Sequence, residues 1–382
     1  MARERVSGWL PIGALWLVLG AGLAALTSQV ADWYVMTDEL LYERLAIAIG
    51  QLHSPLPHVH GELIGNVNQL YPLLLAPLFA GRLVPSGLHD AHILNAFVMS
   101  SACIPAFLLA RRVMHGSRLA YAVAALSVAI PWIALSSFLM TEALAYPVFL
   151  WAVLALHNAA VSPSTRNDAI LLVAVAASVF ARTQFAVLLV VIPLALLLNR
   201  FSLRRLVSEH RLLAVVYAAL AVVAVVLLPL GQLSRVLGTY SVTAEGNLVP
   251  SGTPRSLLEH LAVVGLGLGI VPFVLATAWL LTPFVRHRTT EERAFASVTI
   301  VTVLALLFEV TSYDLRFGAG RLHDPYLFYV VPLILIAFGA MLLERRWSRV
   351  TIIASGSLLA IAFSFLPVVS YDKFNVDSPV AL

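Results

Sequence analysis

Apolar runs of about 20 residues, the length that a helix needs to cross a membrane, recur from one end of the chain to the other. Short loops that carry arginine separate them. Apolar residues form 60% of the chain and charged residues only 12%, and the mean hydropathy is +0.91. Such a composition excludes an ordinary soluble domain and predicts an all-α polytopic membrane protein.

We expect eleven transmembrane helices in a single membrane domain that covers residues 1–382. The first apolar run exceeds the ~7–15-residue core of a cleavable signal peptide, so we expect it to be retained. The single cysteine, Cys103, excludes an intrachain disulfide and a cysteine metal cluster. The expected spans are Trp9–Val30, Ala91–Ala110, Leu119–Ser136, Leu144–Ala160, Ala169–Ala181, Phe185–Leu198, Leu212–Leu230, His260–Val285, Phe295–Ser312, Tyr326–Leu343 and Val350–Pro367.

The distribution of arginine predicts the orientation, because cytoplasmic loops of membrane proteins keep an excess of basic residues. With the N-terminus in the cytoplasm, most arginines fall on the cytoplasmic side, and the reverse orientation would place this excess outside. We therefore expect a multi-pass protein of the plasma or inner membrane. The basic residues assigned to the cytoplasm are Arg3, Arg5, Arg111, Arg112, Arg118, Arg166, Arg200, Arg204, Arg205, Arg211, Arg286, Arg288, Arg293, Arg345, Arg346 and Arg349.

In this topology residues 31–90 form a long outer loop with two amphipathic pieces. Tyr71–Val84 is apolar but short and contains two prolines, which predicts an interfacial or re-entrant helix. Asp38–Ile49 has an apolar stripe that includes Leu41, beneath a polar edge that includes Glu39. Such a helix would lie on the membrane surface and hold its N-terminal acids at a fixed depth.

Three acids of the outer face are candidates for chemistry. Asp38 and Glu39 open the first amphipathic piece, and Glu142 lies at an outer turn between two spans. A carboxylate at the edge of the bilayer is costly unless it is solvated or paired, so we expect Glu142 to face a polar cavity. The alternatives are that the first two acids complement the helix dipole and that Glu142 is a water-exposed turn residue.

Several outer cations run against the cytoplasmic bias. Arg182 lies at the top of a short helix pair, and Arg316, Arg321 and His323 lie in a glycine-containing loop before the tenth span. Arginine binds phosphate through two parallel hydrogen bonds, so these residues are candidates for holding an anionic headgroup or diphosphate. The alternatives are a structural pair between Arg182 and Glu142, and ordinary anchoring to lipid headgroups.

A divalent metal ion is a further option in the first outer loop. His53, His58 and His60 lie near Glu62, and imidazoles with a carboxylate can hold Zn²⁺. Their spacing matches no specific metal motif, and a polar or pH-responsive loop is the alternative. No cofactor is otherwise indicated, and we expect no nucleic-acid partner.

Several short motifs follow one another along most of the chain, namely Asp38-Glu39 with Tyr42, Tyr71–Phe79, Leu108–Val113, Thr141-Glu142, Ala181–Gln184 and Arg321–Leu327. Their order resembles the GT-C superfamily of membrane glycosyltransferases, which use polyprenyl-phosphate sugars. The branch that it resembles most contains protein O-mannosyltransferases, lipid A aminoarabinose transferase and bacterial cell-wall arabinosyl- and mannosyltransferases.

The resemblance implies an inverting transfer of sugar to an acceptor hydroxyl at the outer face. Asp38 would be the general base, Glu39 a helper or solvent-facing cap, and Glu142 a second acid that positions the acceptor or a metal. The resemblance implies that the donor phosphate is bound by Arg321 and His323, and we add further expected contacts. Arg182 and Tyr71 are expected to contact the phosphate, and Tyr42, Gln69 and Arg316 the substrate.

Two departures from the family pattern matter. Tyr71 stands where many members carry a lysine that contacts phosphate, so another group must neutralise the leaving phosphate. Many members also carry a soluble outer C-terminal domain, whereas this sequence ends soon after its last expected span. Either acceptor recognition is confined to loops or such a domain is missing.

The acceptor is expected to be a glycan, lipid or protein of the cell envelope. Arginine is abundant and lysine nearly absent, which is typical of a GC-rich bacterial genome. The main alternative function is a lipid or small-molecule transporter or flippase. The sequence shows no pair of broken helices in matching halves, and the acids lie at one face instead of the bilayer centre, which favours the transferase. A non-catalytic scaffold is the third alternative.

Overall fold

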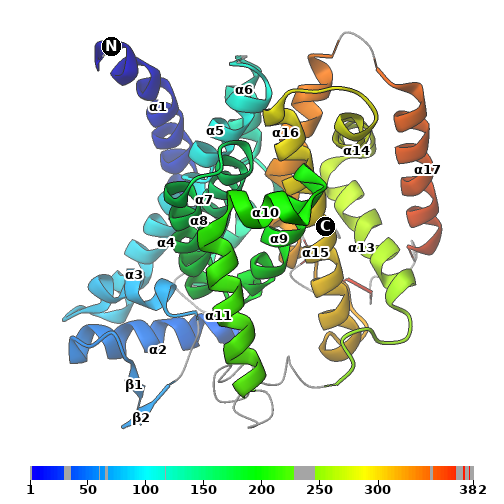
Figure 1. Cartoon of the computed structure of the whole chain (residues 1–382). Coiled ribbons are helices and arrows are strands. Elements are labelled where there is room, and N and C mark those ends of the chain that lie inside the picture. The colour runs from blue at the N-terminus through cyan, green and yellow to red at the C-terminus, as the bar shows by residue number, and fades with distance from the viewer. Residues whose placement is uncertain are drawn as a thin grey trace.

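The computed structural model describes residues 2–29, 36–59, 61–64, 68–116, 118–227, 246–344, 347–366, 373–374 and 378. These residues form a bundle of helices, with the start of α1 at one end and the short strands β1 and β2 at the other (Figure 1). The strands pair antiparallel, with His58 opposite Leu63. The fold of the described residues is therefore almost entirely helical, as the composition predicts.

The helices follow the apolar runs of the sequence closely. Leu144–Ala160 was expected as a span and lies inside α7, and Phe295–Ser312 lies inside the long helix α15. The elements are α1 Ala2–Thr27, α2 Thr37–Leu52, β1 His58–Val59, β2 Glu62–Leu63, α3 Leu70–Phe79, α4 Val84–Ser100, α5 Cys103–Val113, α6 Leu119–Leu126, η1 Pro131–Ser137, α7 Glu142–Val161, α8 Thr165–Ala181, η2 Thr183–Val187, α9 Leu188–Arg200, α10 Leu203–Glu209, α11 Arg211–Leu227, α13 Thr253–Leu268, α14 Ile270–Val285, α15 Thr290–Phe317, η4 Asp324–Tyr326, η5 Phe328–Val330, α16 Val331–Leu342 and α17 Arg349–Phe365.

Several of these helices are long and apolar enough to cross a membrane. Among the described residues there are five, or up to eight if each of three bent helix pairs forms one span. The eleven spans expected from the sequence exceed this number because some of the apolar helices are short: α17, for example, has 17 residues. The protein is thus a multi-pass membrane protein by the length and composition of its helices.

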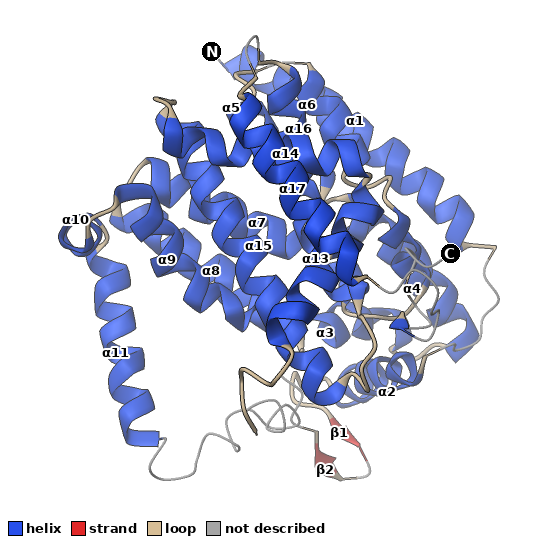
Figure 2. Cartoon of the chain, turned by 90° about the vertical axis from the view of Figure 1, so that its right-hand side faces the viewer, coloured by secondary structure: helices blue, strands red, loops and turns tan. Residues whose placement is uncertain are grey.

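Two expected spans are broken by a bend. Leu119–Ser136 is divided into α6 and η1, with a bend of 55° between them. His260–Val285 was expected to be a single helix, but α13 and α14 meet at Gly269 with a bend of 114°. Gly269 adopts φ of +87°, a conformation that residues with a Cβ rarely reach, so the helix cannot continue through it. Figure 2 shows α13, α14 and α17 on the face that turns toward the viewer, with α11 at the edge of the bundle.

The two amphipathic pieces of the first outer loop form α2 and α3, which pack against each other across one end of the bundle (Figure 1). Their backbones approach closely at Gly50, where an added Cβ would lie 2.9 Å from the carbonyl oxygen of Ala76. The orientation of α2 matches the prediction in part. Leu45 and Ala48 of the expected apolar stripe are buried, but Leu41 is exposed and the acid Glu39 is buried with them.

Candidate functional site

Polar side chains from five parts of the chain gather at the end of the bundle that α2 crosses. Asp38 comes from the start of α2, Glu142 from the start of α7 and Arg182 from the turn between α8 and η2. Tyr313, near the end of α15, and Tyr326, in η4, complete the group. We call these five residues the outer site, after the orientation expected from the sequence. They come from distant segments of the chain, which the fold brings together at α2, η2 and η4.

A buried ion pair forms the base of the outer site. The Nη1 atom of Arg182 lies 2.7 Å from Oε1 of Glu142 and donates a hydrogen bond to Oγ1 of Thr141 at 2.8 Å. The side chains of Glu142 and Arg182 are only 3% and 13% exposed. Nε of Arg182 donates to Gln184, and its guanidinium lies 5.1 Å from the ring centre of Tyr326. The ion pair between Arg182 and Glu142, which the sequence offered as one alternative, is confirmed.

Asp38 lies beside this pair but forms no hydrogen bond or ion pair with it. Its carboxyl group has an exposed face and makes no hydrogen bond or ion pair with the residues that the structure describes. Partial burial raises the pKa of Asp38 above its ordinary value, the charge of Glu142 raises it further, and Arg182 offsets part of this effect. A carboxylate with this pKa shift, unengaged and close to solvent, is suited to accept a proton.

Glu39, the neighbouring acid, has a different environment. It is 2% exposed, and its two carboxylate oxygens accept hydrogen bonds from the backbone N–H of Met36 at 2.9 Å and of Leu139 at 3.0 Å. The first bond caps α2, and the second ties α2 to the segment that precedes α7. Glu39 is therefore a buried cap and not a solvent-facing one, and it holds Asp38 beside Glu142.

The expected phosphate contact Tyr71 is fully buried. Its hydroxyl donates to Oδ1 of Asn95 at 3.1 Å, and Nδ2 of Asn95 donates to the carbonyl oxygen of Phe138. Tyr42 is also buried and packs edge-on against Tyr71 with ring centres 5.6 Å apart. These contacts leave Tyr71 no surface toward a ligand, so we leave it out of the proposed donor contacts.

This arrangement carries a prediction about Tyr71. Tyr71→Phe removes two buried hydrogen bonds between the hydroxyl and the amide of Asn95 and should lower the free energy of unfolding by about 1–3 kcal/mol. A phosphate contact would predict the opposite pattern, a large loss of donor affinity with little change in stability. Thermal unfolding and donor binding of the purified variant separate the two, and a tenfold weaker donor affinity at unchanged stability would restore Tyr71 to the site.

The segment that precedes α3 contributes two amide side chains, Asn68 and Gln69. Asn68, which the sequence-based prediction missed, accepts hydrogen bonds from the N–H and the hydroxyl of Thr183 at 2.7 Å each and donates to Tyr42 at 3.3 Å. It thereby joins the first outer loop to η2. Oε1 of Gln69 is buried and finds no partner among the described residues, which leaves it able to accept a hydrogen bond.

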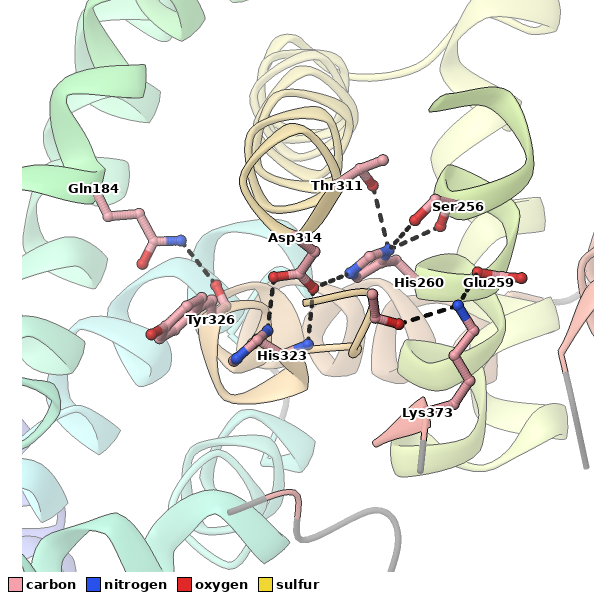
Figure 3. Close-up of polar contacts among 10 residues, drawn as sticks. Gln184, Ser256, Glu259, His260, Thr311, Asp314, His323, Tyr326 and Lys373 are labelled. Carbon is pink, nitrogen blue, oxygen red and sulfur yellow. Dashed lines mark hydrogen bonds and ion pairs between the residues drawn. The ribbon is translucent and has the colours of Figure 1, made fainter. Parts of the chain in front are cut away.

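His323 is held by a second cluster, centred on Asp314 (Figure 3). Nδ1 of His323 lies 2.7 Å from Oδ1 of Asp314, and the backbone N–H of His323 donates to Oδ2 at 2.9 Å. Nε2 of His260, from α13, lies 2.8 Å from the same Oδ2, and its Nδ1 lies 2.8 Å from the carbonyl oxygen of Ser256. The imidazole of His323 stacks on Tyr326, so this cluster fixes His323 next to the outer site.

Sequence reasoning missed Asp314 and His260, although Asp314 adjoins Tyr313 in the loop segment that supplied His323. The remaining cations of that segment lie apart from the ion pair. Arg321 is exposed, and Nε of Arg316 donates to the carbonyl oxygen of Ser312 while its guanidinium lies over Phe317. Within the part of the chain that the structure describes, no contact joins either arginine to Glu142 or Arg182.

The described residues contain no group of three or more His, Cys, Asp or Glu side chains that could hold a metal ion. His53 and His58 are exposed, whereas His60 and the side chain of Glu62 lie outside the described residues.

No protein-family model matches the chain, and no curated protein or solved structure is detectably similar to it.

Proposed function

We propose that this protein is an inverting membrane glycosyltransferase of the GT-C type. It would move a sugar from a polyprenyl-phosphate donor to a hydroxyl of a cell-envelope acceptor. The observation that carries the proposal is Asp38: an unengaged carboxylate with a raised pKa, held by Glu39 beside the buried pair of Glu142 and Arg182. This arrangement supplies a base and a fixed positive charge in one place.

In the proposed reaction Asp38 takes the proton of the acceptor hydroxyl as that oxygen attacks the anomeric carbon of the sugar. The bond between this carbon and the phosphate oxygen breaks on the opposite face, and polyprenyl phosphate leaves with the bonding electrons. The proton then passes from Asp38 to water. Because the donor already has a good leaving group, alignment, one proton transfer and stabilisation of phosphate charge suffice.

The negative charge of the leaving phosphate must be stabilised by cationic side chains or by N–H hydrogen-bond donors. Arg182 offers a guanidinium fixed by Glu142 and Gln184, and His323 offers an imidazole fixed by Asp314 and Tyr326. Both side chains are partly buried, so they would act on phosphate without a large reorganisation. We assign Arg182 and His323 to the donor phosphate.

An apolar groove supports a lipid-linked donor. It has a volume of about 720 Å³ and lies between α1, α4 and α7, lined among others by Trp16, Phe97, Leu144 and Trp151. Leu144 follows Glu142 within the first turn of α7, so the groove begins close to the outer site. An isoprenoid chain in this groove would bring its phosphate to the end of the bundle where Asp38 lies.

The proposed orientation puts the N-terminus in the cytoplasm of the plasma or inner membrane, with the eleven expected spans and the outer site on the far face. Two features support it. The start of α1 and the outer site lie at opposite ends of the bundle (Figure 1). The helix α5 ends in Arg111 and Arg112 at the same end as the start of α1, as the excess of cytoplasmic arginine predicts.

The proposal is tested by reconstituting the protein in vesicles with a panel of radiolabelled polyprenyl-phosphate sugars and candidate acceptors. Transfer of label to a water-soluble or lipid acceptor, dependent on acceptor, supports it. Movement of labelled lipid across the bilayer without any transfer supports a flippase instead. That rival is favoured by the three bent helix pairs, of which the break between α13 and α14 is the sharpest, since broken helices are common in transporters.

The raised pKa of Asp38 predicts how transfer depends on pH. Only the ionised carboxylate can take the proton, so transfer falls as pH drops through this pKa, which lies above the ordinary 3.8. In Glu142→Gln one cause of the raised pKa is removed and the charge of Arg182 is no longer compensated. Both changes lower the pKa of Asp38. The fall of the transfer rate on the acidic side, which we call the acid limb of the pH profile, should therefore move to lower pH.

The measurement is the maximal transfer rate against pH for the wild type and for Glu142→Gln, each normalised to its own plateau. Normalisation separates the position of the acid limb from any loss of rate. An acid limb that stays in place or moves to higher pH would show that Asp38 is not the titrating base.

A further inference from the structure

A second pocket lies at the opposite end of the bundle from the outer site. The helix α15 connects the two ends, and its 28 residues span about 42 Å at 1.5 Å per residue. The pocket has a volume of about 510 Å³. We call it the basic pocket, and its lining residues are Val113, Met114, His115, Arg286, His287, Arg288, Glu292, Ala340, Leu343 and Glu344.

The two acids of the basic pocket are already engaged within the protein. Oε1 of Glu344 lies 2.6 Å from Nη1 of Arg288. Oε2 of Glu292 accepts hydrogen bonds from the backbone N–H and the hydroxyl of Thr289, at 2.9 and 3.0 Å, and so caps α15. Oε1 of Glu292 lies 3.7 Å from Arg288 and from His115. Arg288 therefore pairs with both acids and balances one of their two negative charges.

The remaining nitrogen-bearing side chains are available to a ligand. The side chains of Arg286 and His287 are exposed and make no hydrogen bond or ion pair with any described residue, and the side chain of His115 is 61% exposed. The floor differs from this rim, because Val113, Met114 and Ala340 are apolar and nearly fully buried. The pocket thus combines an arginine fork and two imidazoles with an apolar wall.

We propose that the basic pocket binds a phosphate group, held by Arg286, His287 and His115. A guanidinium and two imidazoles supply several N–H donors, which suits the multiple oxygens of a phosphate better than a single carboxylate. The apolar floor accommodates the organic part that carries the phosphate. The source is either the headgroup of an anionic lipid in the adjacent leaflet or a small organic phosphate, and both present the same chemistry.

The test uses the full-length protein in an uncharged detergent, with two probes: glycerol 3-phosphate and a short-chain phosphatidylglycerol. Binding is measured by the shift in unfolding temperature over a titration. Arg286→Ala/His287→Ala should bind at least about tenfold more weakly, because charge-assisted hydrogen bonds are lost. Arg204→Ala is the matched control, since Arg204 is an exposed arginine of α10 outside the pocket, and it should bind as the wild type does.

Each outcome has a meaning. Equal binding of both probes, lost in the double variant, supports a site for small organic phosphates, and binding of the lipid alone, lost in the same variant, supports a lipid-headgroup site. The proposal is overturned if neither probe binds the wild type, or if the double variant binds as the wild type does. Both substituted residues are exposed, so the variant should fold, and the assay does not depend on sugar transfer at the outer site.

Discussion

Asp38→Asn should lower the rate of sugar transfer by about 10²–10⁴-fold, the range that a positioned general base contributes. Asparagine keeps the size and polarity of the side chain but cannot take a proton from the acceptor hydroxyl. The donor-binding side chains Arg182 and His323 are untouched, so donor affinity should stay close to that of the wild type. The measurement is single-turnover transfer together with donor binding.

The fold should survive this substitution. A raised pKa means that the folded state disfavours the ionised form of Asp38, so above the ordinary pKa of 3.8 its charge costs stability, and asparagine removes that cost. The unfolding temperature at neutral pH should therefore be unchanged or higher. Asp38→Glu retains a carboxylate and should keep part of the activity. Transfer by Asp38→Asn at the wild-type rate would remove Asp38 from the mechanism.

Arg182→Met should be the most destabilising single change at the outer site. It leaves the carboxylate of Glu142, only 3% exposed, without its partner. Breaking a buried ion pair by removing one member costs about 3–5 kcal/mol, because the other charge stays buried and unpaired. Thermal or denaturant unfolding in detergent measures the loss, and transfer should fall as well because Arg182 is assigned to the donor phosphate.

The matched control is the double variant Arg182→Met/Glu142→Gln. Removing both charges relieves the unpaired carboxylate, so it should recover much of the lost stability while transfer stays low. Losses in stability that simply add would show that the two side chains act independently and that the pair does not organise the outer site.

The helices could be predicted because long apolar runs admit few alternatives in a membrane. The break at Gly269 could not, since the run from Gly265 to Gly269 alternates glycine with leucine and keeps the hydropathy of a span. The faces of α2 were predicted only in part. Adjacent residues of a helix point about 100° apart, and only packing against α3 and the bond to Leu139 decide that Glu39 is buried and Asp38 exposed.

Part of the site could be predicted for a physical reason. An acid and an arginine near the bilayer edge need partners, which anticipated the pair of Glu142 and Arg182. The Asp314 cluster was harder, because His260 lies 54 residues before Asp314 and its helix α13 was expected to cross the membrane as part of a longer span. The structural role of Tyr71 could have been anticipated from Asn95. Asn95 is a polar residue inside an expected span and needs a buried hydrogen-bond partner, which Tyr71 provides.

The most direct test of the central claim is the anomeric configuration of the transferred sugar. A donor of known configuration is supplied to the reconstituted wild-type protein, and the configuration of the product is determined by nuclear magnetic resonance. Base-assisted attack by the acceptor on the face opposite the phosphate predicts inversion. Retention of configuration, or movement of the lipid with no sugar transferred, would contradict the account.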